Sequence, residues 1–291
     1  MRYDNNEEIE GLMFTAVECA YAVAKSGFPY TKEMWDSIVA VLDPEIDKEA
    51  RKYNPQRGVA PRSEVIVNAL KKSGIKQVVE FAAGWTTHGL MLCKQDPNFK
   101  YIEVLYKNKK LGIDEAEEKR QVLGHMAPSV GGIPENYHIL GGDALDEATF
   151  EEAAALLDPR QPAAVANVGL MGYFTDEQKL QYAMQVKTLL QEFGGKWITQ
   201  DFTVPRKLSP KLSERLIKKT GACNPFTSKR EVSKLLADAG LSRSFLLDEK
   251  TLKALTLDTK LVNCNIAERM LKTSSYSDID VPKKGGREES L

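Results

Sequence analysis

Glycine, acidic and aromatic residues that could bind a ligand follow four apolar stretches of this 291-residue chain. The clearest stretch is VVEFAAGWTTHG, residues 78–89, which contains Glu80, Gly84 and His88. An apolar run that ends at an acidic residue and a glycine predicts a strand, a tight turn and then a helix. Glycine lets a ligand approach the backbone, and the helix begins with free N–H groups and a partial positive charge. A cofactor pocket and an ordinary strand–helix turn both fit this stretch.

The glycine spacing argues against one kind of pocket. A usual dinucleotide site follows G-x-G-x-x-G, but Ala82 occupies the position of the first glycine, and Trp85 directly follows Gly84. This spacing counts against a nicotinamide-dependent oxidoreductase. Binding of NADH in preference to other nucleotides would support that class of enzyme instead.

The second and third stretches contain carboxylates. Glu103 lies in YIEVLY and could accept hydrogen bonds from ribose hydroxyls, although the residue nearer the strand tip is Leu105. A glutamate that faces solvent or pairs with a helix is the alternative. In GGDALD, Asp143 could accept a hydrogen bond from an exocyclic amine, and a neighbouring backbone N–H could donate to a ring nitrogen. Asp146 is expected to cap a helix instead.

The fourth stretch, NVGLMGYFT, begins at Asn167 and contains two glycines and Tyr173. It precedes a helix whose start is marked by Thr175 and Gln178, the two residues of a capping box. A loop that lines a binding site and a simple turn with a packed aromatic ring both fit this pattern.

All four stretches fall at the ends of expected strands. The expected strands are 77–82, 101–106, 137–141, 163–168 and 196–202, and the expected helices between them are 86–94, 114–126, 147–157 and 175–193. Strands that are apolar almost throughout and separated by helices predict a doubly wound, mostly parallel α/β sheet that is covered on both faces. Such a sheet binds ligands beyond the carboxyl ends of its strands.

Further elements are expected on both sides of this alternation. The chain up to about residue 54 has a helical pattern. Residues 203–227 contain three prolines and a basic helical piece, which fit either a lid or a surface excursion. The other expected elements are an amphipathic helix at 228–240, closing strands at 245–247 and about 254–264, and a disordered tail from residue 282.

The composition excludes several kinds of partner and site. The net charge is −1, so there is no overall basic field to hold nucleic acid or an anionic membrane. The four cysteines form no C-x-x-C pair and the three histidines are scattered, so we expect no metal site. The N-terminus has no apolar signal sequence, and no run approaches the about 18–20 apolar residues of a membrane span. We therefore expect a soluble, cytoplasmic protein.

In order and spacing, these stretches resemble a class I S-adenosylmethionine (SAM)-dependent methyltransferase. The similarity covers roughly residues 55–270 and points most to the branch with leucine carboxyl methyltransferases and TcmP-type polyketide O-methyltransferases. The matching features are Pro61-Arg62-Ser63 ahead of the first core helix, VVEFAAGWTTHG, YIEV, GGDALD, NVGLMGYFTDEQ and the SKREVSKLLADAG helix.

The resemblance implies a Rossmann-like methyltransferase fold with a seven-stranded sheet and a reversed last strand. It divides the chain into an N-terminal helical cap, residues 1–60, and a SAM-binding core, residues 61–273. The core includes a lid-like insertion at about residues 203–227, and residues 274–291 are expected to form a flexible tail.

The resemblance also implies roles for single residues. It places Arg62 against the methionyl carboxylate of SAM, and Glu80 and Gly84 where the backbone meets the methionine moiety. Glu103 stands near the ribose. The remaining positions are Asp143 and Ala144 at the adenine, Asn167 near the amino group, and Tyr173 on the substrate side.

Two residues depart from the family pattern. The family has an aspartate where this chain has Leu105, and an acidic residue ends the fourth strand where this chain has Asn167. A charge-assisted hydrogen bond contributes about 1.5–3 kcal/mol, so two losses weaken binding by roughly tenfold to a few hundredfold or more. Either Glu103 and water compensate for the losses, or the pocket has changed.

The predicted function is SAM-dependent transfer of a methyl group to a carboxylate or hydroxyl of a small molecule or a peptide end. The main task of such an enzyme is to align nucleophile and methyl group. A carboxylate acceptor needs no base, whereas a hydroxyl needs one or a polarised site. His88 is the candidate base and Tyr173 the candidate substrate contact. The alternative is an inactive methyltransferase-fold protein that acts as a binding partner or scaffold. The sequence leaves the acceptor and the oligomeric state open.

Overall fold

The computed structural model describes residues 7–52, 60–202, 223–241, 245–246 and 277–281, together with the single residues 214 and 217. Most of the expected lid-like insertion at 203–227 and the expected strand at 254–264 lie outside this part of the chain. No helix within the described part is long and apolar enough to cross a membrane.

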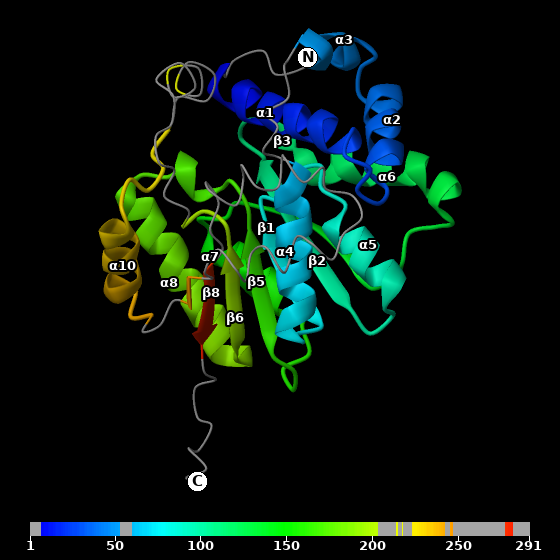
Figure 1. Ribbon diagram of the computed structural model, residues 1–291. Coiled ribbons are helices and arrows are strands. Elements are labelled where there is room, and N and C mark those ends of the chain that lie inside the picture. Colours follow the sequence, from blue (N-terminus) through cyan, green and yellow to red (C-terminus); the bar gives the residue numbers. More distant parts are fainter. Residues whose placement is uncertain are drawn as a thin grey trace.

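One mixed β-sheet forms the centre of the protein (Figure 1). Its strands are β1 Gln77–Phe81, β2 Lys100–Asn108, β3 Ile113–Asp114, β4 Tyr137–Gly142, β5 Ala163–Asn167, β6 Gly195–Thr199, β7 Phe245–Leu246 and β8 Ser277–Val281. The main strands lie in the order β4-β2-β1-β5-β6-β8-β7, and β3 pairs with the end of β2. The first five of these main strands are parallel, whereas β8 is antiparallel to both of its neighbours. The structure therefore confirms the expected α/β fold with a mostly parallel sheet and a reversed last strand.

Strand β8 extends the core beyond its expected end. Residues 274–291 are expected to be a flexible tail, but residues 277–281 pair with β6 over five successive positions. Two of the five residues in the sequence SDIDV are aspartates, which are rare in strands, so residue propensity does not predict this strand.

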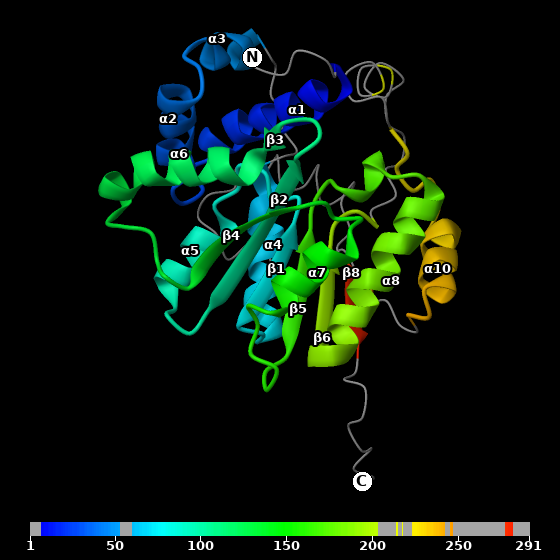
Figure 2. The same ribbon diagram turned by 180° about the vertical axis from the view of Figure 1, so that it is seen from behind.

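Helices cover both faces of the sheet. They are α1 Glu7–Ala24, α2 Thr31–Val41, α3 Glu45–Lys52, α4 Ala60–Ser73, α5 His88–Gln95, α6 Glu115–Val130, α7 Glu147–Ala154, α8 Asp176–Phe193 and α10 Lys229–Asp238, with the 3₁₀ helix η1 at Met171–Tyr173. Helices α1, α2, α4, α5 and α6 contribute to one hydrophobic cluster, and α7, α8 and α10 contribute to a second cluster on the other face (Figures 1 and 2). The sheet is thus doubly wound, as the alternating pattern predicts.

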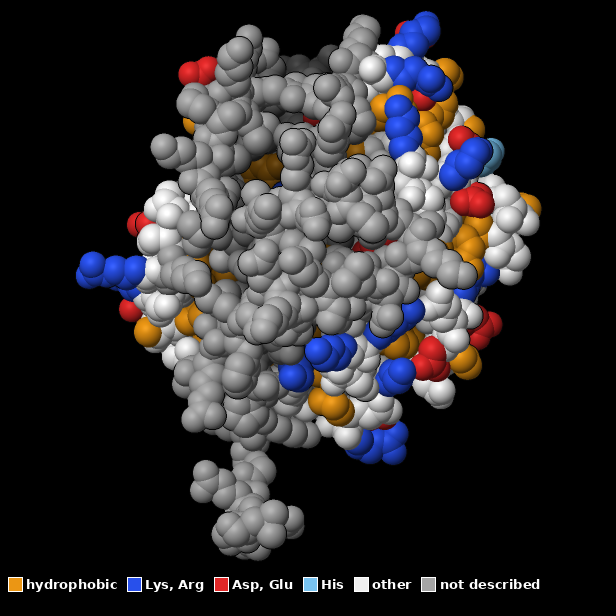
Figure 3. Space-filling view, in the orientation of Figure 1, with side chains coloured by type: hydrophobic (Ala, Val, Ile, Leu, Met, Phe, Trp, Pro, Cys, Tyr) orange, Lys and Arg blue, Asp and Glu red, His pale blue; other side chains and the backbone are white. Residues whose placement is uncertain are grey.

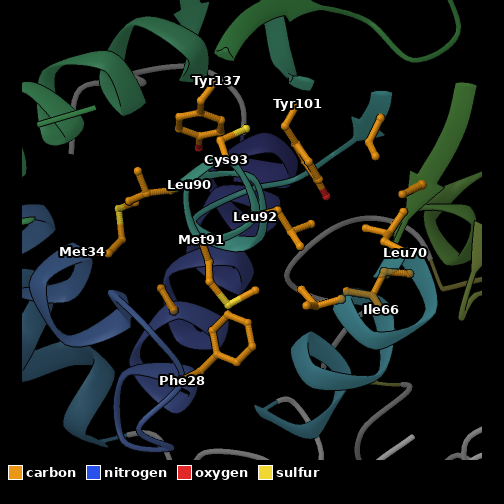
Figure 4. Packing of buried hydrophobic residues seen from close by; sticks show 14 of the residues in the cluster. Phe28, Met34, Ile66, Leu70, Leu90, Met91, Leu92, Cys93, Tyr101 and Tyr137 are labelled. Carbon is orange, nitrogen blue, oxygen red and sulfur yellow. The ribbon is translucent and has the colours of Figure 1, made fainter. Parts of the chain in front are cut away.

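Successive strand residues point into opposite clusters, because side chains alternate along a strand. In β1, Val78 belongs to the first cluster and Val79 to the second, and both are fully buried. Figure 4 shows the first cluster, in which side chains of α5 lie between those of α2, α4 and β2. Helix α5 is therefore buried on several sides, and its position fixes the loop that precedes it.

Two expected helix starts are confirmed. Thr175 accepts a hydrogen bond from the backbone N–H of Gln178 and the Gln178 side chain accepts one in return, which completes the capping box of α8. Asp146 caps α7 by accepting a hydrogen bond from Ala148. These two caps fix the ends of the loops that follow β4 and β5. Both loops lie at the carboxyl ends of parallel strands, the edge of the sheet where ligands are expected.

Helix α1 crosses the carboxyl ends of the central strands in both views (Figures 1 and 2). A Cβ atom at Gly84, in the loop after β1, would lie 3.6 Å from the Cβ atom of Ala16 in α1. The N-terminal helices therefore cover the region where the sequence places a binding site. On the face shown in Figure 3, basic and acidic side chains are interspersed with small hydrophobic areas on the described surface, as a net charge of −1 suggests.

Candidate functional site

The loop between β1 and α5 has an unusual backbone. Both Ala82 and Gly84 have a φ angle of 54°, in the left-handed region that glycine adopts readily and other residues avoid. Ala82 keeps this conformation while its N–H donates to the Val104 carbonyl at 2.9 Å. Ala82 stands where the glycine pattern has its first glycine, so here an alanine adopts a backbone conformation that suits glycine. Backbone strain of this kind concentrates at functional sites.

The first turn of α5 has no side-chain cap, and its residues are buried. Its N-cap residue Thr87 makes no side-chain capping hydrogen bond, because its hydroxyl donates to the Pro29 carbonyl at 2.8 Å. The N–H groups at the start of a helix need an acceptor and attract negative charge. The start of α5 therefore presents donors directly after the left-handed turn.

Glu80 lies below this loop in a buried hydrogen-bond network. Its carboxylate is 1% exposed, contacts Nδ1 of His88 at 3.0 Å and accepts a hydrogen bond from the Tyr101 hydroxyl at 2.8 Å. Burial alone raises the pKa of Glu80, but His88 and Tyr101 outweigh burial and lower that pKa below its usual value. Glu80 is thus held ionised, and it supports the loop from beneath.

His88 shares this burial. Its side chain is 2% exposed, its ring meets the Phe28 ring edge-on, and its Nε2 atom is buried without a hydrogen-bond partner in the described part of the chain. A role for His88 as a general base stays a prediction, and it requires Nε2 to become accessible to a substrate.

Glu103 is also buried, and its partner is a lysine that sequence reasoning missed. The side chains of Glu103 and Lys119 are both 0% exposed and form an ion pair. Lys119 Nζ further donates to the carbonyls of Gly84 at 2.7 Å and Thr86 at 3.0 Å. Burial raises the pKa of Glu103. Lys119 lies in the charged helical run EEKR, where nothing distinguishes it in the sequence from a surface lysine.

Asn167 ends β5 with all of its side-chain hydrogen-bonding groups in use. Its amide donates to Thr199 Oγ1 at 3.0 Å and to Asp201 Oδ2 at 2.7 Å. Its carbonyl accepts from Trp197 Nε1 at 2.7 Å and from the Tyr182 hydroxyl at 3.3 Å. The predicted contact of Asn167 with a cofactor amino group is untested, and this side chain already serves to lock three neighbouring elements together.

Asp201 is a second residue that sequence reasoning missed. Its carboxylate accepts hydrogen bonds from Asn167 and from the backbone N–H groups of Gly169, Leu170 and Met171. Asp201 therefore fixes the loop after β5, the loop that continues to Tyr173. Residues Asn167 and Thr199 are paired in the register of β5 and β6. Asp201 follows Thr199 by two residues, so it brings a carboxylate to the end of β5 from the turn after β6.

Tyr173 borders a cavity of about 270 Å³ that is lined by residues 173–177 together with Cys223 and Asn224. Burial, with the nearby Cys19 and Asp201, raises the pKa of Tyr173 to about 12, so its phenol stays protonated at neutral pH. Arg62 lies near enough to oppose this shift, and its side chain is exposed. Tyr173 and Arg62 are thus brought to the same side of the protein, as their predicted roles require.

Asp143 and Ala144 lie beyond the end of β4 and are half-buried. The Asp143 carboxylate accepts a hydrogen bond from the Leu145 N–H at 2.9 Å, and the Asp143 N–H donates to the Thr149 hydroxyl at 3.1 Å. These bonds fix the loop and leave the predicted adenine contacts as predictions. Within the described residues, no group of histidine, cysteine and acidic side chains is arranged to hold a metal ion.

Known structures share this fold at low sequence identity. No family model and no curated protein matches the sequence. The structure of PigF with S-adenosylhomocysteine (SAH) superposes with a TM-score of 0.52 at 12% identity, covering 90% of this chain and 68% of PigF. A putative O-methyltransferase from Nostoc punctiforme gives 0.48 at 15% identity, over 91% of this chain and 72% of the other. The pyocyanin biosynthetic protein PhzM gives 0.47 at 12% identity, over 84% and 61%.

The likeness to PigF shows the fold and nothing finer. The chain has a Rossmann-like α/β fold, which it shares with PigF. The leucine carboxyl methyltransferase branch suggested by the sequence remains a hypothesis. The chain spans between 61% and 72% of the length of these three proteins.

Proposed function

We propose that this protein binds SAM and transfers its methyl group to a carboxylate or hydroxyl oxygen of a small molecule or a peptide end. The observation that carries this proposal is the left-handed turn at Ala82 and Gly84, directly before the uncapped start of α5. This turn lies at the carboxyl end of a central strand, where open α/β sheets bind their ligands. The presence of SAH in the PigF structure supports the choice of cofactor.

The residues around the turn fit a cofactor of this kind. The backbone near Gly84 would receive the methionine end, with Arg62 as partner of its carboxylate, and Asp143 and Ala144 would contact the adenine. When bound, SAM supplies an electrophilic methyl group on a sulfonium sulfur. The protein supplies position: Lys119 holds the Gly84 and Thr86 carbonyls, so the turn keeps one conformation and alignment costs less entropy.

Two carboxylates, Asp176 and Glu177, are among the residues that line the cavity, and hydrogen bonds from Asn224 and Lys179 lower the pKa of Asp176, which makes it a weaker base. Tyr173, whose pKa is about 12, can donate a hydrogen bond to an acceptor but does not accept its proton at neutral pH. His88 is buried. A carboxylate acceptor, or a hydroxyl that is already acidic, needs no base and suits this arrangement better than an alcohol.

One set of contacts favours a second candidate function, a protein that keeps the fold as a binding partner or scaffold without methylating. The side chains of Glu80, Glu103 and Asn167 are buried and bound to protein partners. They contribute to a cofactor pocket only indirectly. This candidate predicts that no acceptor is methylated, even where SAM binds.

Calorimetric titration with SAM, SAH and NADH tests the proposal. Micromolar binding of SAM or SAH, followed by methylation of an acceptor in a mass-spectrometric screen, is the expected result. Binding without turnover on any acceptor supports the scaffold candidate. Absence of SAM and SAH binding up to millimolar concentration contradicts the cofactor assignment, and binding of NADH alone points to an oxidoreductase.

A matched pair of variants locates the site. Gly84 and Gly74 both have a left-handed φ angle, and an added Cβ meets no atom closer than 3.6 Å at either position. Gly84→Ala and Gly74→Ala therefore carry similar backbone strain, about 1 kcal/mol each. Only Gly84→Ala is expected to weaken SAH binding, because Gly74 precedes β1 and therefore lies at the opposite end of this strand from the proposed turn. Equal loss of SAH affinity in both variants would contradict a site at Gly84.

A further inference from the structure

The end of β2 has an apolar residue, Leu105, where a carboxylate could accept hydrogen bonds from ribose hydroxyls. Leu105 occupies the relevant position, is 2% exposed and packs against Ala83 and Ala116 in a small apolar cluster. Its side chain therefore points into the protein and offers no hydrogen-bond acceptor. Glu103, two residues earlier, is fully buried and paired with Lys119, so it does not reach the strand end.

Another carboxylate returns to the same strand end from α6. Strand β3 pairs antiparallel with β2, with Lys107 opposite Asp114. This hairpin places the next residue, Glu115, beside Tyr106. Oε2 of Glu115 accepts a hydrogen bond from the Tyr106 N–H at 3.2 Å. The carboxylate thus lies one residue beyond Leu105, at the edge of the sheet where the turn at Gly84 also lies.

Glu115 is not needed to cap its helix. Asp114 is the N-cap of α6, and its side chain accepts the hydrogen bond from the Glu117 N–H at 3.0 Å. The side chain of Glu115 is partly exposed. Within the described residues, its second oxygen, Oε1, has no recorded hydrogen-bond partner, although a carboxylate can accept several. An unused acceptor at this strand end is what two vicinal ribose hydroxyls would satisfy.

We infer that Glu115 is the residue that binds the ribose hydroxyls of SAM, in place of a carboxylate at position 105. The inference rests on the proposed function, because it assigns one contact of the proposed cofactor. Burial and the neighbouring Glu118 raise the pKa of Glu115 to about 7, which is the behaviour of a carboxylate short of donors. Two ribose hydroxyls supply such donors.

The test measures three ligands against three proteins. SAH and methylthioadenosine both contain the ribose, whereas adenine does not. The proteins are the wild type, Glu115→Gln, and the control Glu117→Gln, which changes an exposed glutamate of the same helical turn. Gln at position 115 keeps an acceptor for the Tyr106 N–H, and thermal unfolding checks that each variant folds.

At pH 8, where a carboxylate with a pKa of about 7 is mostly ionised, we expect Glu115→Gln to weaken SAH and methylthioadenosine by the same factor, about tenfold or more, since a hydrogen bond to a charged acceptor is exchanged for a neutral one. Adenine binding and the Glu117→Gln control should stay at wild-type values. Unchanged SAH affinity in Glu115→Gln overturns the inference, and so does equal weakening of adenine. If the wild type binds none of the three ligands, the proposed function itself has failed.

Discussion

At the scale of single residues, Ala82 is an alanine held in a backbone conformation that suits glycine. Its left-handed φ angle costs an alanine roughly 1–2 kcal/mol. Replacement by glycine removes this cost. It also raises the entropy of the unfolded chain, which offsets about 0.4–1 kcal/mol of the gain in stability. We expect Ala82→Gly to raise the free energy of unfolding by about 0.5–1 kcal/mol, as measured by urea denaturation.

The control for this prediction is Ala155→Gly. Ala155 is also exposed, but its φ angle of −61° is ordinary for an alanine. Glycine should therefore destabilise the protein there by about 0.5–1 kcal/mol. If Ala82→Gly destabilises the protein as Ala155→Gly does, the turn is not strained and the argument that it is built for a ligand loses its main support.

The family pattern has an acidic residue at the end of the fourth expected strand, where this chain has Asn167. Asp201, which follows the neighbouring strand β6, explains this difference. A carboxylate at position 167 would face the Asp201 carboxylate, which now lies 2.7 Å from the Asn167 amide. We expect Asn167→Asp to lower the free energy of unfolding by about 2–4 kcal/mol, because like charges in a buried site repel. The exchange Asn167→Asp with Asp201→Asn restores one carboxylate and one amide.

The free energy of unfolding of the double variant should exceed the value expected from the two single variants by at least about 1 kcal/mol, because residues in one hydrogen-bond network are coupled. A double-mutant cycle of urea denaturation measures this coupling. Strictly additive effects would show that the two side chains do not share one charge, and Asn167 would then need another explanation.

The predictability of the site follows from these residues. Motif positions such as Gly84 and Tyr173 are adjacent to apolar runs, so the sequence marks them. Lys119 contacts Gly84 over 35 residues, Asp201 contacts Met171 over 30 residues, and Glu115 acts across a hairpin. No local pattern indicates them, because their partners are chosen by strand order and register.

At the scale of elements, the close approach of α5 to β2 depends on one glycine. A Cβ atom at Gly89 would lie 2.5 Å from the Tyr101 ring and 2.6 Å from the Tyr137 ring. Both rings are buried, and Tyr101 also donates to Glu80. We expect Gly89→Ala to destabilise the protein by about 1–3 kcal/mol, by pushing α5 from the sheet and disturbing the turn before it.

Gly124 provides the matched comparison in α6. An added Cβ there meets nothing within 4 Å, so Gly124→Ala should stabilise the helix by about 1 kcal/mol. Thermal unfolding of both variants gives the comparison. The same sign of effect in both would mean that helix propensity, and not the contact with the two tyrosines, determines the result at Gly89.

The elements themselves were largely predictable. Helices α5, α6, α7 and α8 begin within two residues of their expected starts, because caps and apolar periodicity are local signals. Strand β8 was not expected, since two of its five residues are aspartates, which are rare in strands. The hairpin that contains β3 was also not expected, and it is the hairpin that delivers Glu115 to the end of β2.

At the scale of the whole molecule, the N-terminal helices and the sheet share one core. Met34 and Ile38 of α2 belong to the same buried cluster as Ile66, Leu90 and Val122. The Thr87 hydroxyl also donates to Pro29, so the turn near Gly84 is tied to the N-terminal segment. A cap that shares its core in this way should not unfold separately from the rest.

We therefore expect one unfolding transition and a global effect of a substitution in α2. Ile38 is 0% exposed, and Ile38→Ala should cost about 2–5 kcal/mol and lower the midpoint of the single calorimetric transition by roughly 5–15 °C. Ile217, which is 51% exposed, is the control, and Ile217→Ala should leave the midpoint nearly unchanged. An early transition in Ile38→Ala with the main transition unmoved would make the N-terminal helices a separate unit. In that case the cover over the proposed cofactor site would be able to open while the sheet stays folded.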